Sequence, residues 1–174
     1  RLINWISALL GRVPGGLPLT TVTAAEVFGA ISGSSSATVA ALAKILYPAL
    51  LKGGYGEKFS LGLITSSGAI ALIRPPSIAM ILSSVVTNAS IGKLFLAGFL
   101  PGIVVGLCAA VYCVWFALKN KITSGRTWSL VEIVRTSREV VWTLGAPLLI
   151  FAGIYGGFMT PTEASMAVSV YAVL

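Results

Sequence analysis

The stretch Gly29–Leu51 reads GAISGSSSATVAALAKILYPALL, and it sets a small polar cluster between two apolar arms. The cluster is SGSSS, Ser32–Ser36, and the arms are Leu17–Ile31 before it and Ala37–Leu51 after it. As an α-helix each arm is about 22 Å long, shorter than the ~30 Å hydrocarbon core of a bilayer. Because neither arm is long enough to cross, the pattern predicts a re-entrant helical hairpin with the serines at its tip.

The composition is that of an integral membrane protein. The 174 residues are 56% hydrophobic and 10% charged, with a mean hydropathy of +0.95, whereas a soluble domain carries roughly 25% charged residues. There is no histidine and every acidic residue is a glutamate, which excludes histidine-dependent catalysis and histidine-containing metal sites. The net charge of +7 does not indicate nucleic-acid binding, because the basic residues cluster between apolar segments, where they orient a protein in the membrane.

Polar breaks divide the chain into segments of an all-α membrane fold. The predicted segments are an interfacial or scaffold helix end over 1–13, the re-entrant hairpin over 17–52, a broken transmembrane helix over 57–88, a transmembrane helix over 91–118, a cytoplasmic amphipathic connection over 119–139, a transmembrane helix over 140–159, and the start of a further transmembrane helix over 160–174. The break in the second long segment is IRPPS, because two consecutive prolines remove two backbone donors. Both ends of the chain look cut, so we expect a piece of a larger protein.

Two short motifs have structural interpretations. Gly98, Gly102 and Gly106 recur at four-residue spacing, which predicts a face for close packing of a neighbouring helix. The sequence TPTEA fits a capping box, with Thr160 as the N-cap and Glu163 reaching back to it.

The distribution of basic residues favours the hairpin over a single crossing. With a re-entrant hairpin, Lys93 stands alone on one side of the membrane and most other basic residues share the cytoplasmic side. Those residues are Arg12, Lys52, Lys58, Lys119, Lys121, Arg126, Arg135 and Arg138. A single crossing would move Arg12 to the opposite side and weaken the bias, whereas two very short crossings would give the same distribution.

The serine cluster and the Pro-Pro break predict a binding site. Irregular backbone is tolerated at membrane depth only where protein buries it or where it lines a polar cavity. If the tip meets the break, hydroxyls and freed carbonyls converge, which suits a monovalent cation. Helix N-termini after Ser36 and Ser77 suit an anionic group. The sequence therefore predicts a site for sodium, a carboxylate, or both.

Arg74 is the most informative charge, because arginine beside a break is costly in a membrane unless it is paired or faces a cavity. One interpretation is that its guanidinium binds a substrate carboxylate. The other is that it pairs with an acid in a further part of the protein or reaches the interface. Glu26 and Lys44 could face each other across the hairpin arms, and a structural pair or interfacial positions are expected rather than a proton relay.

Enzymatic functions fit poorly. GSSSA superficially resembles a nucleophile elbow, but no histidine is present to activate the serine. No phosphate-binding loop of the G-x-x-x-x-G-K-[ST] type occurs, so this chain does not itself hydrolyse nucleotide. An intramembrane hydrolase would need a histidine from elsewhere.

Four motifs, in order, carry a resemblance to a known family: ISGSSSATVAAL, SGAIALIRPPSIAMIL, SIGKLFLAGFLPG and GIYGGFMTPTEA. They resemble the large membrane subunit of tripartite ATP-independent periplasmic (TRAP) transporters, the DctM-like permeases. The resemblance implies an elevator-type secondary transporter built from two inverted repeats, of which this chain holds the first and the start of the second. It also implies sodium-coupled import of an organic acid, such as a dicarboxylate or sialic acid, across the bacterial or archaeal inner membrane.

The resemblance further implies partners and site residues. The partners are a small membrane subunit, a periplasmic substrate-binding protein and the lipid bilayer. The implied sodium ligands are Ser32, Gly33, Ser34, Ser35, Ser36, Gly68, Pro75 and Pro76. The predicted substrate-binding residues are Ser34, Ser36, Arg74 and Ser77. Sodium is the coupling ion, and no other metal or cofactor is expected.

The chain departs from the family pattern just before the prolines. Family members often read GTIGPIIPPS, whereas this chain reads GAIALIRPPS, with Arg74 in place of an apolar residue. Because of this departure, the sequence does not identify the substrate.

Two other functions are also compatible with the sequence. One is a channel with the serine loop as its selectivity filter, and the other is a structural membrane subunit.

Overall fold

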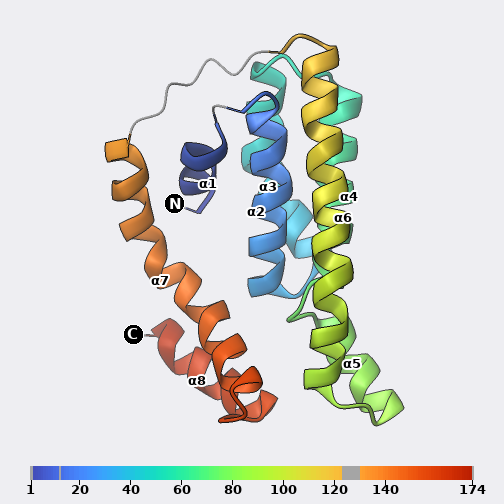
Figure 1. Ribbon diagram of the computed structural model, residues 1–174, viewed down its shortest axis with the longest axis vertical. Helices are drawn as coiled ribbons and strands as arrows, with labels where there is room; N and C mark the ends of the chain where they lie inside the picture. The colour runs from blue at the N-terminus through green and yellow to red at the C-terminus, as the bar shows by residue number, and fades with distance from the viewer. Residues whose placement is uncertain (1, 12, 123–129, 174) are drawn as a thin grey trace.

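The computed structural model describes residues 2–11, 13–122 and 130–173, and no β-strand occurs among them. The helices are α1 (Leu2–Leu10), α2 (Gly16–Ser32), α3 (Ser35–Lys52), α4 (Glu57–Ile73), α5 (Ile78–Thr87), α6 (Ile91–Lys119), α7 (Leu130–Tyr155) and α8 (Pro161–Val173). Helices α2, α3, α4 and α6 form an upright bundle, with α5 at its lower end and with α7 and α8 alongside (Figure 1). The predicted all-helical class is confirmed.

The polar cluster lies at the turn of a helical hairpin. Helix α2 ends with Gly33 in the left-handed conformation, at φ +63°, where its N–H donates to the Gly29 carbonyl. This is the usual C-terminal stop of a helix, and it suits glycine because a Cβ is disfavoured there. Ser34 is extended and α3 begins at the next residue. The two helices therefore correspond closely to the two apolar arms.

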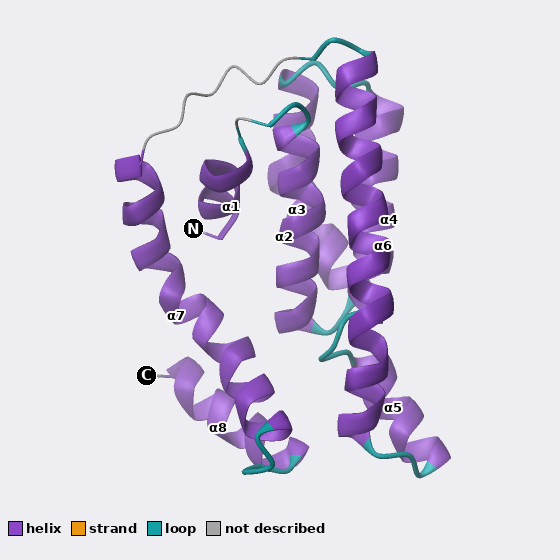
Figure 2. Cartoon of the chain, viewed as in Figure 1, coloured by secondary structure: helices purple, strands orange, loops and turns teal. Residues whose placement is uncertain are grey.

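The Pro-Pro sequence separates α4 from α5. Helix α4 ends at Ile73 and α5 begins at Ile78, with both Arg74 and Ser77 in extended conformations. The α region is disfavoured before proline, and proline lacks the N–H that a continuing helix would need. We call residues 74–77 the link. In Figure 2 the link and the hairpin tip are neighbouring loops among the helices.

Helix α6 has 29 residues and two unlike faces. A narrow stripe is buried against the bundle, and it consists of Phe95, Gly98, Gly102, Gly106, Cys113 and Ala117. The rest is apolar but exposed, as at Leu100 and Val111, which is the pattern of a helix facing lipid or further protein. Two stretches of the described chain, Glu57–Thr87 and Ile91–Lys119, are long and apolar enough to cross a membrane.

Helix α7 begins earlier than its predicted segment. It starts at Leu130, so part of the expected connection over 119–139 is already helical, while residues 123–129 lie outside the described part. The sequence LVEIVRTSRE contains no proline or glycine, so nothing in it stops the helix. Near its start, the Trp5 Nε1–H donates to Ser137 Oγ at 2.8 Å and links α1 to α7.

Two apolar clusters hold the hairpin in the bundle. One joins α2, α3, α4 and α6 through Leu19, Val22, Leu50, Tyr55, Leu63, Ile64 and Cys113. The other joins α1 to the hairpin through Ile6, Ala24, Ala25, Leu42 and Leu46. Between helices in a membrane, such clusters stabilise through van der Waals packing rather than through removal of apolar surface from water. The tip and the link are thereby placed on a fixed helical support.

Candidate functional site

The hairpin tip contacts the link of the broken helix. The Ile78 N–H, at the start of α5, donates to the Gly33 carbonyl at 3.3 Å. A Cβ on Gly33 would lie 3.2 Å from Ile78 Cγ1 and 3.3 Å from its backbone nitrogen. Glycine is therefore required at the tip by its backbone angle and by this close approach. Two polar interruptions, far apart in sequence, meet at one place.

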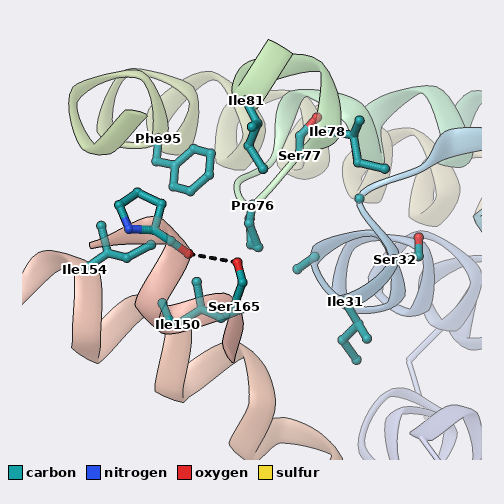
Figure 3. A pocket seen from close by; sticks show the side chains of 14 residues that line it. Ile31, Ser32, Pro76, Ser77, Ile78, Ile81, Phe95, Ile150, Ile154 and Ser165 are labelled. Carbon is teal, nitrogen blue, oxygen red and sulfur yellow. Dashed lines mark hydrogen bonds between the residues drawn. The ribbon is translucent and has the colours of Figure 1, made fainter. Parts of the chain in front are cut away.

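A cavity of about 190 Å³ opens beside this contact (Figure 3). Four of the predicted site residues line it, namely Ser32 and Gly33 from the tip and Pro76 and Ser77 from the link. Its other walls come from α2, α5, α6, α7 and α8, through Ala30, Ile31, Ile78, Ile81, Phe95, Ile150, Ile154, Pro161, Ala164 and Ser165. The cavity is thus mainly apolar, with a few polar groups gathered where tip and link meet. That composition is typical of small-molecule sites.

Ser77, in the cavity wall, has a buried hydroxyl without a hydrogen-bond partner among the described residues. Only 1% of the residue is exposed. It stands at the N-cap of α5, yet its side chain does not cap that helix. A buried hydroxyl without a partner costs about 1–3 kcal/mol. Ser77 lines the cavity, while its hydroxyl oxygen is itself enclosed by protein, and a polar atom of a ligand is one partner that would satisfy it.

The N-termini of α3 and α5 add positive potential to the same region. Neither Ser34 nor Ser77 caps its helix through a side-chain hydrogen bond. The first N–H groups of a helix have no partner within it, and together they carry about half a positive charge. The start of α5 lines the cavity and the start of α3 follows the tip, so both ends favour an anionic group in this region.

The serines of the hairpin tip form hydrogen bonds mainly within the tip and the first turn of α3. Ser32 Oγ lies 3.0 Å from Thr38 Oγ1 and accepts a hydrogen bond from the Ser34 N–H at 3.3 Å. Ser34 Oγ lies 3.2 Å from Ser36 Oγ. Ser34, Ser35 and Ser36 do not line the cavity. In this conformation they order the turn, so their predicted ligand roles remain predictions.

Gly68 and Pro75 lie behind the cavity wall. A Cβ on Gly68 would overlap Val39 Cγ2 and would lie 3.4 Å from the Ser35 carbonyl, so this glycine lets α4 approach the start of α3. Pro75 is fully buried in the link. Neither residue is among those lining the cavity. Their geometry supports packing of the tip, and their sodium contacts also remain predictions.

Arg74 does not line the cavity. Its Nη1 donates to Glu26 Oε2, so the guanidinium is paired with an acid of α2. Neither interpretation drawn from the sequence included this partner. The expected pair of Glu26 with Lys44 is wrong, because the carboxylate of Glu26 is paired with Arg74 of the link and Lys44 is exposed on α3.

The TPTEA motif forms the predicted capping box. The Thr160 N–H donates to Glu163 Oε2 at 2.7 Å, and the Glu163 N–H donates to Thr160 Oγ1 at 3.4 Å. These bonds satisfy donors at the start of α8. The first turn of this helix forms one wall of the cavity, where Ser165 Oγ donates to the Pro161 carbonyl at 2.8 Å (Figure 3).

Three residues of the cavity wall and one buried serine outside it were not predicted from the sequence. Ser67, 1% exposed, does not line the cavity, but like Ser77 it is a buried serine whose hydroxyl has no hydrogen-bond partner among the described residues. The polar run TSSG in α4 is a signal that points to it. Phe95, Ile150 and Ile154 carry no comparable signal, because apolar residues in membrane helices look alike whether they face lipid or a cavity.

The donor set suits an alkali cation better than a transition metal. Across the described residues, no three His, Cys, Asp or Glu side chains come together. What the tip and link offer is hydroxyl and carbonyl oxygen, which are hard ligands. The Gly33 carbonyl has a second lone pair beyond the one that accepts from Ile78.

A helical hairpin packed against a broken helix, with a cavity at their contact, is an arrangement that recurs in membrane transport proteins. The family model described as "Tripartite ATP-independent periplasmic transporter, DctM component" matches residues 1–174, and the chain belongs to this family. The resemblance inferred from the four motifs is confirmed.

Characterised relatives agree with this assignment. The chain is 44% identical over its whole length to an ectoine TRAP transporter large permease of Halomonas elongata, of which it covers 41%. It is 38% identical, again over its whole length, to an isethionate TRAP transporter permease named DctMQ of Oleidesulfovibrio alaskensis, of which it covers 28%. Over 98% of the chain it is 38% identical to a C4-dicarboxylate large permease of Pseudomonas aeruginosa, covering 40% of that protein. The chain thus spans well under half the length of these relatives.

Proposed function

We propose that the chain is the part of a large permease that forms a sodium and substrate site, in a transporter that imports an organic acid. The observation that carries this proposal is the buried, unpartnered hydroxyl of Ser77 at the cavity between tip and link. A sodium ion or a carboxylate oxygen would supply the missing partner. The uncapped starts of α3 and α5 favour the anion.

The substrate is a small organic acid. The relatives described above are named for ectoine, isethionate and C4-dicarboxylates. Each of these compounds carries a carboxylate or sulfonate group, which matches helix N-termini and a serine hydroxyl. The apolar walls at Ile150 and Ile154 would hold the rest of the molecule. A sialic acid is a further candidate that the resemblance implies.

The same geometry supports sodium as the coupling ion we propose. Carbonyl and hydroxyl oxygens of the tip and link would hold the ion, and no acidic side chain lines the cavity to attract a divalent cation. An ion bound there would fix the tip against the link before substrate binds. Removal of the ion would release the Gly33–Ile78 contact.

The assembly we propose is a multi-pass permease of the inner membrane. The hairpin would be re-entrant and would move with α4 and α5 against a fixed scaffold, as in elevator transport. A small membrane subunit would complete the permease, and a periplasmic binding protein would deliver the substrate. The name DctMQ of one relative suggests that the two membrane subunits are fused in that protein.

Uptake by the complete transporter tests the proposal. The full-length permease with its small subunit and binding protein is reconstituted in vesicles, and labelled ectoine, isethionate, succinate and sialic acid are offered under a sodium or a potassium gradient. We expect sodium-dependent uptake of at least one compound, lost in Ser77→Ala. Ser84→Ala is the control, because this buried serine of α5 already donates to the Ala89 carbonyl at 2.5 Å.

Three results would overturn all or part of the proposal. Sodium flux that needs neither substrate nor binding protein would identify a channel. Uptake that is the same in Ser77→Ala and the original protein would remove the hydroxyl from the site. If a proton gradient alone drives uptake and sodium has no effect once that gradient is held constant, the coupling ion is a proton.

A further inference from the structure

The Glu26–Arg74 ion pair joins the hairpin arm to the link at a defined place. Glu26 lies on α2, two turns before the tip at Gly33, and Arg74 is the first residue of the link. Both side chains are largely buried, with 14% of Glu26 and 26% of Arg74 exposed. Arg74 directly precedes Pro75, so an anchor on its guanidinium fixes the start of the link.

The glycines of α6 make room for this pair. A Cβ on Gly106 would overlap Glu26 Oε1, and a Cβ on Gly102 would lie 3.6 Å from the Cα and Cβ of Arg74. The four-residue spacing of these glycines predicted close packing of a neighbouring helix. At these two positions the glycine face instead accommodates two charged side chains, and only Gly98, near the Ile73 carbonyl and Met80, packs against the broken helix itself.

Pairing inside the bundle has an energetic consequence. Removing one member of a buried ion pair is strongly destabilising, whereas apolar residues at both positions are often no less stable. The pair therefore adds little stability over an apolar contact. Its specific contribution is a fixed geometry between α2 and the link.

We infer that Glu26 and Arg74 are positioning residues, which hold the link against α2 so that Ser77 and the start of α5 meet the tip. In this arrangement Arg74 binds Glu26 and does not bind substrate. The inference rests on the proposed function for its effect on transport. Its structural effect, on the Gly33–Ile78 hydrogen bond, is independent of any substrate.

Amide hydrogen exchange on the full-length permease tests the structural effect. Glu26→Gln and Arg74→Gln are compared with Lys44→Gln, an exposed basic residue of the hairpin. We expect the Ile78 amide to exchange about tenfold faster in both variants of the pair, because its opening free energy falls locally. Amides in the middle of α6 should keep their rates. Unchanged exchange at Ile78, or equal acceleration throughout the bundle, would overturn the inference.

The two α6 glycines provide a test that leaves both charges in place. Gly106→Ala introduces a methyl group into the space of the Glu26 carboxylate, whereas Gly102→Ala meets Arg74 at an ordinary contact distance. We expect Gly106→Ala to accelerate exchange at Ile78 and Gly102→Ala to leave it near the original rate. Equal effects of the two substitutions would indicate simple helix packing and contradict a role for the pair.

Transport kinetics separate positioning from substrate binding. Using whichever of ectoine, isethionate or succinate the transporter takes up, we expect Glu26→Gln and Arg74→Gln to raise the half-saturating concentration by a similar factor, about tenfold. The maximal rate per folded transporter should change by less than about twofold. Tighter uptake in Glu26→Gln with loss of uptake in Arg74→Gln would make Arg74 a substrate ligand. If no compound is taken up, the proposed function fails while the exchange experiments still decide the inference.

Discussion

The backbone N–H of Ile78 donates to the carbonyl of Gly33 at 3.3 Å, so the first residue of α5 is bonded to the tip of the hairpin. The two residues come from different helix pairs, and each sits where a helix begins or ends. This one contact therefore brings the serine cluster to the Pro-Pro link. The unpartnered hydroxyl of Ser77 lies at the same place, beside the cavity.

Gly33→Ala should weaken this contact by more than its backbone strain alone. A left-handed residue other than glycine costs about 1–2 kcal/mol, and the added Cβ would also press on Ile78 at 3.2 Å. Gly54→Ala is the matched control, because Gly54 has φ +83° and no neighbour within 4 Å of a Cβ. Thermal unfolding of the full-length permease measures both. Equal losses in the two variants would show that the tip contact contributes nothing.

Removal of the unpartnered hydroxyls should not destabilise the protein. Ser67→Ala and Ser77→Ala each delete a buried group that lacks a hydrogen bond, so we expect the unfolding midpoint to stay or rise. In contrast, Ser60→Ala removes a buried hydroxyl that donates to the Gly56 carbonyl at 3.0 Å, and it should cost about 1 kcal/mol. Destabilisation of Ser77→Ala equal to that of Ser60→Ala would mean that its hydroxyl has a partner within the protein.

The hairpin and the break could be predicted from sequence because their signals are local. Gly33 ends a helix through its own backbone angle, and Pro75 and Pro76 interrupt one through their own rings. The Glu26–Arg74 pair was missed because its members are 48 residues apart and meet only through packing of α2 on α4. Side-chain length and charge indicate that Arg74 needs a partner, but they do not indicate which one.

The cavity wall was missed for a related reason. Phe95, Ile150 and Ile154 are indistinguishable in sequence from residues such as Leu100 that remain exposed on α6. Only the fold decides which apolar side chains face the tip. The early start of α7 was missed because charged residues indicated a polar connection between two membrane segments, although residues 130–139 contain no residue that stops a helix.

The capping box should stabilise the cavity wall formed by α8. Thr160→Ala removes the oxygen that accepts from the Glu163 N–H, and loss of such an N-cap costs about 0.5–2 kcal/mol. Hydrogen exchange in the first turn of α8 should accelerate by a corresponding factor of about 2–30, whereas α2 should be unaffected. Thr65→Ala, which removes an exposed hydroxyl bonded within α4, is the control. Unchanged exchange in α8 would contradict the role assigned to the motif.

The hydrogen bond between Trp5 and Ser137 should couple α1 to α7. Trp5→Phe and Ser137→Ala each remove one partner of the 2.8 Å bond between Nε1 and Oγ. A neutral hydrogen bond contributes about 0.5–1.5 kcal/mol, so the two substitutions together should cost less than the sum of their separate costs by about this amount. Thermal unfolding of the two single variants and the double variant gives the coupling. The cost of the double variant falls below the sum because a shared interaction can be lost only once. Strict additivity would therefore show that this bond contributes nothing and that apolar contacts around it hold α1 against α7.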